Sequence, residues 1–359
     1  MRRALLSAFL VAALALCSLA QSAGGAYDPL GSATTTLVLA KPFASFLRQN
    51  KIAVKAVAPA KVKGKKLTLP LAEGKWDPTT GKGQVESAGA IVFQSAKRKL
   101  PFKDLLVKAN RVPLTAKVGG GKLKVAASKQ ISSKRAGFGS AFTATALKLS
   151  AKAATRLNKK LRPEVPFEAN QLLGTLTANS QPQTMSVLAQ NRLTLALSPE
   201  LIAKLNSLFV SLNPVAPAEL APGPLLSSPI APASTISPDG AQGTIRTEGE
   251  AELLQLGAGQ LFWGEQWLDL SAGADLITAN LQPSPPYAGK QAQGPLFSLS
   301  LAGAQVTPDP QARTVSVANA ALALTQTAAD QMNQLFAQGK GVFKAGEALG
   351  TLSFVAQGQ

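Results

Sequence analysis

Apolar and polar residues alternate along much of the chain. Clear runs of this kind are residues 123–125 (LKV), 193–197 (LTLAL), 297–301 (FSLSL) and 315–317 (VSV). A period of two is typical of strands that bury one face. Gly, Pro, Asn and Asp interrupt these runs about every ten residues, a spacing that predicts an antiparallel sandwich or barrel.

The chain repeats itself. Residues 37–60 align without gaps with residues 195–218, at an offset of 158 positions, and later matches follow in the same order. The last match pairs residues 173–176 (LGTL) with 349–352 (LGTL). Such self-similarity predicts tandem units, which we place at residues 34–178 and 190–355, after an N-terminal segment 21–33 and joined by a polar linker 179–189. One large domain with an internal duplication is the alternative.

Two short helices are predicted in each unit. In the second unit Ser198 is an N-cap, Pro199 takes the first helical position, and Leu201, Ile202, Leu205, Leu208 and Phe209 form one apolar stripe. The later helix begins after Ser150 or Thr325 in the two copies, with matching apolar positions. The predicted fold is therefore mainly β, with two tandem antiparallel β-sandwich or barrel-like units, each with two short helices.

The first 20 residues read as a secretory signal peptide. Arg2 and Arg3 precede an apolar stretch, and residues 18–20 (SLA) form a small-x-small cleavage site. The signal predicts a secreted, extracytoplasmic protein of the cell envelope. Cleavage would remove Cys17, the only cysteine, so we expect no disulfides in the mature chain. A membrane anchor and a lipoprotein modified at Cys17 are the alternatives. No later segment has the ~20 apolar residues of a transmembrane helix.

The composition excludes several chemistries. The chain has no His, so Ser-His-Asp and Cys-His catalysis and His-bound metal sites are absent. Asp104 and Asp269 recur at equivalent positions, but each copy offers one carboxylate where glycoside cleavage needs two. Residues 119–121 (GGG) lack the Lys and Ser/Thr of a phosphate loop. We predict a protein that is not an enzyme, with no catalytic residues and no metal site.

Positive charge is concentrated in the first unit. Residues 1–180 hold 30 basic and 7 acidic side chains, a net +23, whereas the remainder holds 7 and 12, a net −5, which together give +18. Such a field attracts polyanions. The predicted binding patch comprises Lys61, Lys63, Lys65, Lys66, Lys97, Arg98, Lys99, Lys122 and Lys124, and it also includes Lys159 and Lys160. The alternative is a lysine-rich surface that serves solubility alone. Nucleic acid is disfavoured, because few aromatic residues accompany the lysines.

Aromatic residues supply two further candidates. Trp263 and Trp267 fall on one face of a predicted strand, which favours a core position, while stacking on carbohydrate is the alternative. Tyr287 lies in a Pro-rich loop, residues 283–290 (PSPPYAGK), where its ring either packs over the edge of the fold or contacts haem or a sugar.

Several segments, taken in order, resemble the HtaA domain, a secreted actinobacterial module associated with haem transport. They are residues 67–70 (LTLP), 73–78 (EGKWDP), 83–85 (GQV), 89–93 (GAIVF), 115–118 (TAKV), the helix 151–161 and residues 173–176 (LGTL). The resemblance covers both units and implies haem as a candidate cofactor, bound in the family through Tyr and His. Since His is absent, Tyr287 is the candidate haem ligand.

These observations lead to two functional hypotheses. The first is an exported, non-enzymatic envelope binding protein of two HtaA-like modules, linked to haem or iron uptake. The second is a structural or adhesive envelope protein that docks on anionic polymer through its basic first repeat. Salt should distinguish them, because polymer binding weakens steeply with ionic strength and axial ligation of haem does not.

Overall fold

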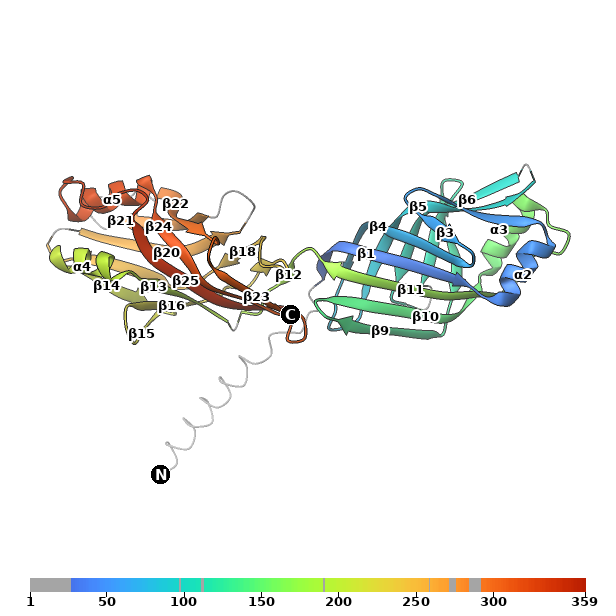
Figure 1. The fold of residues 1–359 in the computed structure, drawn as a ribbon, viewed down its shortest axis with the longest axis horizontal. Helices are drawn as coiled ribbons and strands as arrows, with labels where there is room; N and C mark the ends of the chain where they lie inside the picture. The colour runs from blue at the N-terminus through green and yellow to red at the C-terminus, as the bar shows by residue number, and fades with distance from the viewer. Residues whose placement is uncertain are drawn as a thin grey trace, which may run out of the picture.

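The computed structural model describes residues 27–96, 98–110, 113–189, 191–257, 259–270, 276–283 and 292–359. The expected signal peptide, Lys97 and Tyr287 lie outside the described residues. Two mainly-β units lie end to end (Figure 1).

Among its described residues the first unit contains eleven strands and two helices. In chain order they are β1 Asp28–Leu39, α2 Lys41–Gln49, β2 Ile52–Val57, β3 Lys61–Lys63, β4 Lys66–Trp76, β5 Gly83–Ser95, β6 Arg98–Lys108, β7 Leu114–Val118, β8 Gly121–Ala127, β9 Gln130–Ala136, β10 Gly139–Leu149, α3 Ala151–Leu161 and β11 Leu172–Pro182.

Eight of these strands close into an antiparallel barrel. The order is β5–β6–β7–β8–β10–β11–β1–β4, and β4 pairs again with β5. Inward-facing residues alternate with outward-facing ones, as the sequence period requires: Leu37, Leu67 and Leu176 are buried in one core. Closure removes the free edges that an open sheet would expose.

The second unit repeats this order with more and shorter strands. Its elements are β12 Met185–Ser186, β13 Arg192–Leu197, α4 Pro199–Ser207, β14 Val210–Val215, β15 Glu219–Ala221, β16 Leu225–Pro229, β17 Thr235–Ile236, β18 Gly243–Arg246, β19 Glu250–Gln255, β20 Gly259–Asp269, β21 Leu276–Pro283, β22 Ala292–Ser300, β23 Gln305–Asp309, β24 Thr314–Leu324, α5 Gln326–Phe336 and β25 Ala348–Gln357.

The second unit closes differently from the first. Where β4 pairs with β5 over several residues, the second copy has a single bridge between Ile230 and Thr247. Two backbone hydrogen bonds flank it, from Ala231 N to Arg246 O at 2.8 Å and from Glu248 N to Pro229 O at 2.9 Å. The predicted fold class, two antiparallel mainly-β units with two short helices each, is thus confirmed.

The predicted helix caps are present. The hydroxyl oxygens of Ser150, Ser198 and Thr325 accept hydrogen bonds from the backbone N–H groups three residues further on, at 3.1–3.2 Å. One expectation for α4 was wrong. Phe209 lies beyond the end of the helix with a φ of +54° and is 85% exposed, because the chain turns before the stripe is complete.

An identical asparagine contact anchors the loop after the last helix of each unit. Asn158 donates to Phe167 O at 2.9 Å and accepts from Phe167 N at 2.7 Å. Asn333 makes the same two bonds to Phe343, at 2.7 and 2.8 Å. Each asparagine satisfies both backbone groups of a buried phenylalanine, which fixes the loop against the helix.

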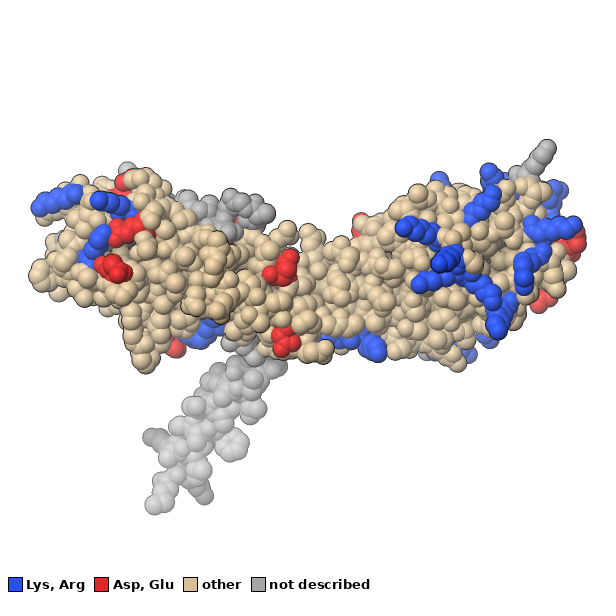
Figure 2. All heavy atoms as spheres, viewed as in Figure 1, with Lys and Arg blue, Asp and Glu red and all other residues tan. Residues whose placement is uncertain are grey.

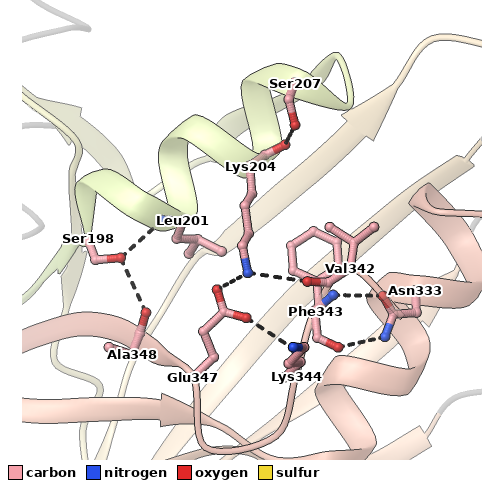
Figure 3. A network of polar contacts seen from close by, with 10 residues as sticks. All are labelled: Ser198, Leu201, Lys204, Ser207, Asn333, Val342, Phe343, Lys344, Glu347 and Ala348. Carbon is pink, nitrogen blue, oxygen red and sulfur yellow. Dashed lines mark hydrogen bonds and ion pairs between the residues drawn. The ribbon is translucent and has the colours of Figure 1, made fainter. Parts of the chain in front are cut away.

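In the second unit a charged contact adds to this frame, as Figure 3 shows. Lys204 of α4 forms an ion pair with Glu347 and donates to Val342 O at 3.2 Å. Glu347 in turn accepts from Lys344 N at 3.2 Å. The network ties α4 to the loop between α5 and β25.

The two units meet in a buried ion pair. Arg313, between β23 and β24, donates to Asp28 at the start of β1, and both side chains are 3% exposed. Asp28 also accepts from Ser186 N at 3.2 Å. Burial raises the pKa of Asp28 above its ordinary range, and the attraction of Arg313 opposes this shift.

Further contacts extend this junction. Arg135 of β9 donates to Gln311 O at 2.6 Å, and the buried Phe138 packs in the hydrophobic core of the second unit. The units are therefore joined by polar and apolar contacts as well as by the chain.

The boundaries predicted from sequence differ from the strand ends. β1 begins before residue 34, and β11 runs through Pro182, so part of the expected linker 179–189 is strand. That each unit is a separate folding domain stays a prediction. Within the described residues no helix is long and apolar enough to span a membrane.

Candidate functional site

A basic hollow lies on the first unit between α3 and the β7–β8 hairpin. Its volume is about 540 Å³. Four cationic side chains line it, one from β8 and three from α3: Lys122, Lys152, Arg156 and Lys159. Val118 and Leu123 supply apolar surface between them. We call this site the basic groove.

A tight turn shapes one wall of the basic groove. Gly119 and Gly120 both have positive φ, +58° and +86°, between the paired residues Val118 and Gly121. This two-residue hairpin favours glycine, which adopts such angles without steric cost. A Cβ atom on Gly119 would lie 2.7 Å from a guanidinium nitrogen of Arg156, so glycine also makes room for that side chain.

The helix periodicity forms the other wall. Lys152, Arg156 and Lys159 follow one another by four and three residues and so project from one helical face. The opposite face buries Leu157 and Leu161 in the barrel core. Burial of that face holds the three cations toward the β7–β8 hairpin.

The positive charge of the basic groove is not neutralised locally. No acidic residue lines it, and across the described ranges none of its four cations forms an ion pair with Asp or Glu. Lys and Arg side chains gather at the end of the first unit that carries α2 and α3 (Figure 2). Uncompensated cations around a hollow attract and hold anionic groups.

The predicted basic residues do not form one continuous patch. Lys61, Lys63, Lys65 and Lys66 are exposed on the β3–β4 hairpin, whereas Lys122 and Lys124 are exposed on β8. β4 and β8 stand four strands apart in the ring of eight, on opposite sides of the barrel. Arg98 and Lys99 begin β6, where Arg98 donates to Leu161 O, at the end of α3, at 3.5 Å.

Two residues of the basic groove, Lys152 and Arg156, were missing from the sequence prediction. Their signal was available, because they lie on the same helical face as Lys159. A search for dense runs of lysine does not find them, since four and three residues separate these cations along the chain.

The two tryptophans of β20 lie on different faces, which corrects the expectation that they share one. Trp263 is 1% exposed in the core, and Trp267 is 41% exposed. The register of β20 against β21 shifts between Gly264 and Trp267. Such a bulge inserts an extra residue and reverses the alternation beyond it.

Among the described residues, neither Tyr27 nor the interior of the first barrel forms an enclosed haem pocket. Tyr27 is 45% exposed, and the ammonium of Lys75 lies 5.2 Å from its ring centroid. The apolar hollow inside the first barrel holds only about 20 Å³, far less than a porphyrin needs. No group of three or more His, Cys, Asp or Glu suited to a metal occurs in the part of the chain that the structure describes.

The fold defines a protein of two tandem, mainly-β units. Solved structures to which the chain is similar are the C-terminal domain of HtaA from Corynebacterium glutamicum, at 13% identity and a TM-score of 0.36, and the N-terminal domain, at 14% and 0.33. Each comparison covers 48% of this chain and 98% of the solved domain.

A third similar structure is the heme binding protein HtaB of the same organism, at 10% identity and a TM-score of 0.34, covering 49% of this chain and 95% of HtaB. No family model and no curated protein matches the chain. The resemblance to HtaA domains expected from sequence is confirmed as a likeness of fold.

Proposed function

We propose that this protein is an exported, non-enzymatic binding protein of the bacterial envelope, and that its first unit binds an anionic envelope polymer in the basic groove. One observation carries the proposal: four cations from two elements surround a hollow of about 540 Å³ without an acidic neighbour. The signal-like N-terminus supports export.

The chemistry of the groove suits phosphate or carboxylate groups spaced along a chain. The guanidinium of Arg156 offers paired donors that match such groups, and the lysines add flexible point charges. Binding of this kind releases counterions, so the affinity should fall steeply as salt rises.

Titration calorimetry with purified glycerol-phosphate teichoic acid tests the proposal, at about 50 and 200 mM salt. We expect replacement of the four groove cations by Gln to weaken binding by about tenfold or more and to flatten the salt dependence. The matched control replaces Lys61, Lys63, Lys65 and Lys66 by Gln, which removes the same charge from the opposite side of the barrel. An equal loss of affinity in both variants would mean that binding depends on the total surface charge and not on the groove, which would contradict the proposal.

Haem is the second candidate ligand, supported by the resemblance to HtaA domains and by Tyr287. A phenolate oxygen is a known ligand of ferric haem. Titration of the mature protein with haemin, beside Tyr287→Phe, tests it: a Soret band that the substitution abolishes would support Tyr287 as the ligand. A flat Soret region would remove haem from consideration, and a band that survives would exclude Tyr287.

A further inference from the structure

A second hollow, of about 570 Å³, lies on the second unit and plays no part in the function proposed above. It forms where the ends of β14 and β18, the start of β19 and the last part of β20 come together. The residues that matter for its chemistry are Arg246, Glu248, Glu250 and Trp267. We call it the tryptophan hollow.

Trp267 is an exposed indole with a fixed position. The bulge in β20 turns it outward, and 41% of its surface remains open to solvent. Arg246 is its partner across the strand pair, and the guanidinium carbon lies 4.6 Å from the ring centroid. This cation–π contact covers one face of the ring and holds it in place, and the exposed remainder of the indole can serve as an apolar platform.

Charged groups of both signs surround the platform. Glu248 and Glu250 line the tryptophan hollow together with Arg246. Counting described residues only, none of these three side chains takes part in an ion pair. The guanidinium therefore offers hydrogen-bond donors, and the carboxylates offer acceptors, to a ligand in the hollow.

We propose that the tryptophan hollow binds a neutral carbohydrate. The C–H groups of a sugar ring carry partial positive charge and pack on the negative face of an indole. Sugar hydroxyls both donate and accept, so they satisfy the carboxylates and the guanidinium together. The two carboxylates repel an anionic ligand, and a cationic ligand would have to compete with Arg246 for the face of the indole that its guanidinium occupies.

The first unit does not repeat this site. By strand register Leu106 stands where the second unit has Trp267, because Glu86 pairs with Leu106 as Arg246 pairs with Trp267. Phe102, which is 2% exposed, matches the buried Trp263 instead, since it pairs with Ile91 as Trp263 pairs with Ala251. Glu86 stands in the place of Arg246. The platform and its cation are thus features of the second unit, independent of the basic groove.

Binding of the full mature chain to a printed array of neutral and acidic oligosaccharides tests this inference. We expect signal on neutral members that Trp267→Ala lowers at least tenfold. The matched control is Leu256→Ala, which removes an exposed apolar side chain just beyond the other end of β19. It should leave the signal within a factor of two.

Glu250→Gln provides a second variant that does not depend on the indole, and it should also weaken the signal. The best neutral glycan should in addition shift the fluorescence of the exposed Trp267, since Trp76 and Trp263 are buried. Binding to acidic members alone, no binding to neutral members, or equal binding by Trp267→Ala would overturn the inference. The variant lacking the four groove cations should keep the neutral signal, so this outcome is separate from that of the polymer proposal.

Discussion

The helical ends of the two units share one backbone frame but are filled differently. In the first unit Phe43, Phe46 and Phe167 pack together, with ring centroids 5.0–6.3 Å apart. In the second unit Lys204 stands at the position of Phe46, and its partner is Glu347.

The position of Glu347 corresponds to Gln171 in the first unit. The backbone is the same at both, because the carbonyl of Gln171 accepts from Leu149 N at 2.8 Å and that of Glu347 from Leu324 N at 2.9 Å. The copies thus differ at both positions, with a phenylalanine and a glutamine in the first unit and an ion pair in the second. The comparison shows that the asparagine contacts and the backbone hydrogen bonds keep the same backbone structure in both units, while the side chains packed at the helical end differ.

The largest effect is expected at the junction, where the two units can be uncoupled and then compared. Arg313→Met leaves Asp28 buried without its cation, which should lower the free energy of unfolding by about 3–5 kcal/mol. Calorimetry should then resolve two transitions, one for each unit.

The penalty at the junction should depend on pH in a stated direction. Loss of the cation raises the pKa of Asp28 in the folded state further. A carboxyl with a raised folded-state pKa is least destabilising when the pH is below its unfolded-state pKa, because it is then protonated in both states. Arg313→Met should therefore cost less at pH 4 than at pH 8. The double variant Asp28→Leu/Arg313→Met should recover most of the loss; a single variant as stable as the natural chain would show that the pair does not hold the units.

A smaller, paired effect is expected from the asparagine contacts. Asn158→Ala and Asn333→Ala each leave two backbone groups of a buried phenylalanine without partners, at a cost of about 2–4 kcal/mol in the free energy of unfolding. Chemical denaturation of both variants measures the difference. Costs that differ by more than about 2 kcal/mol would mean that the shared frame is not equally important in the two copies.

The smallest effect is expected from the side chains packed at the helical end of the first unit. Phe46→Lys should destabilise the first unit by about 2 kcal/mol, because it removes a partly buried ring and adds an unpaired cation. Adding Gln171→Glu should restore about 1 kcal/mol by recreating the ion pair of the second unit. Gln171→Glu alone is the control for the double-mutant cycle. No coupling between the two positions would show that the copies differ in more than these side chains.

The strands and helices could be predicted because they follow from local patterns. Alternation located β13 and β24, and the hydroxyl caps located α3, α4 and α5. Phe209 does not lie on the predicted stripe, because α4 ends at Ser207 and Phe209 itself has a positive φ. The apolar character of Phe209 gives no sign of this helix end.

The candidate sites were harder to predict, for physical reasons. The exposure of Trp267 depends on a bulge, which shifts the register without a clear mark in the residue pattern. The basic groove depends on the packing of α3 against β8, a contact between segments distant in sequence. The lysines near Lys61 were grouped with those of β8 only because both segments are rich in lysine. The order of the strands around the barrel places them on the opposite side from β8.

The ion pair between Asp28 and Arg313 also has a consequence for avidity. A joint that is buried and hydrogen-bonded on both sides restricts the movement of one unit against the other. Two weak attachments made by such a rod reinforce each other only on a surface whose receptors have a matching separation, because no flexible tether adjusts the distance. The joint would thereby make binding selective for surfaces on which the receptors have the matching spacing.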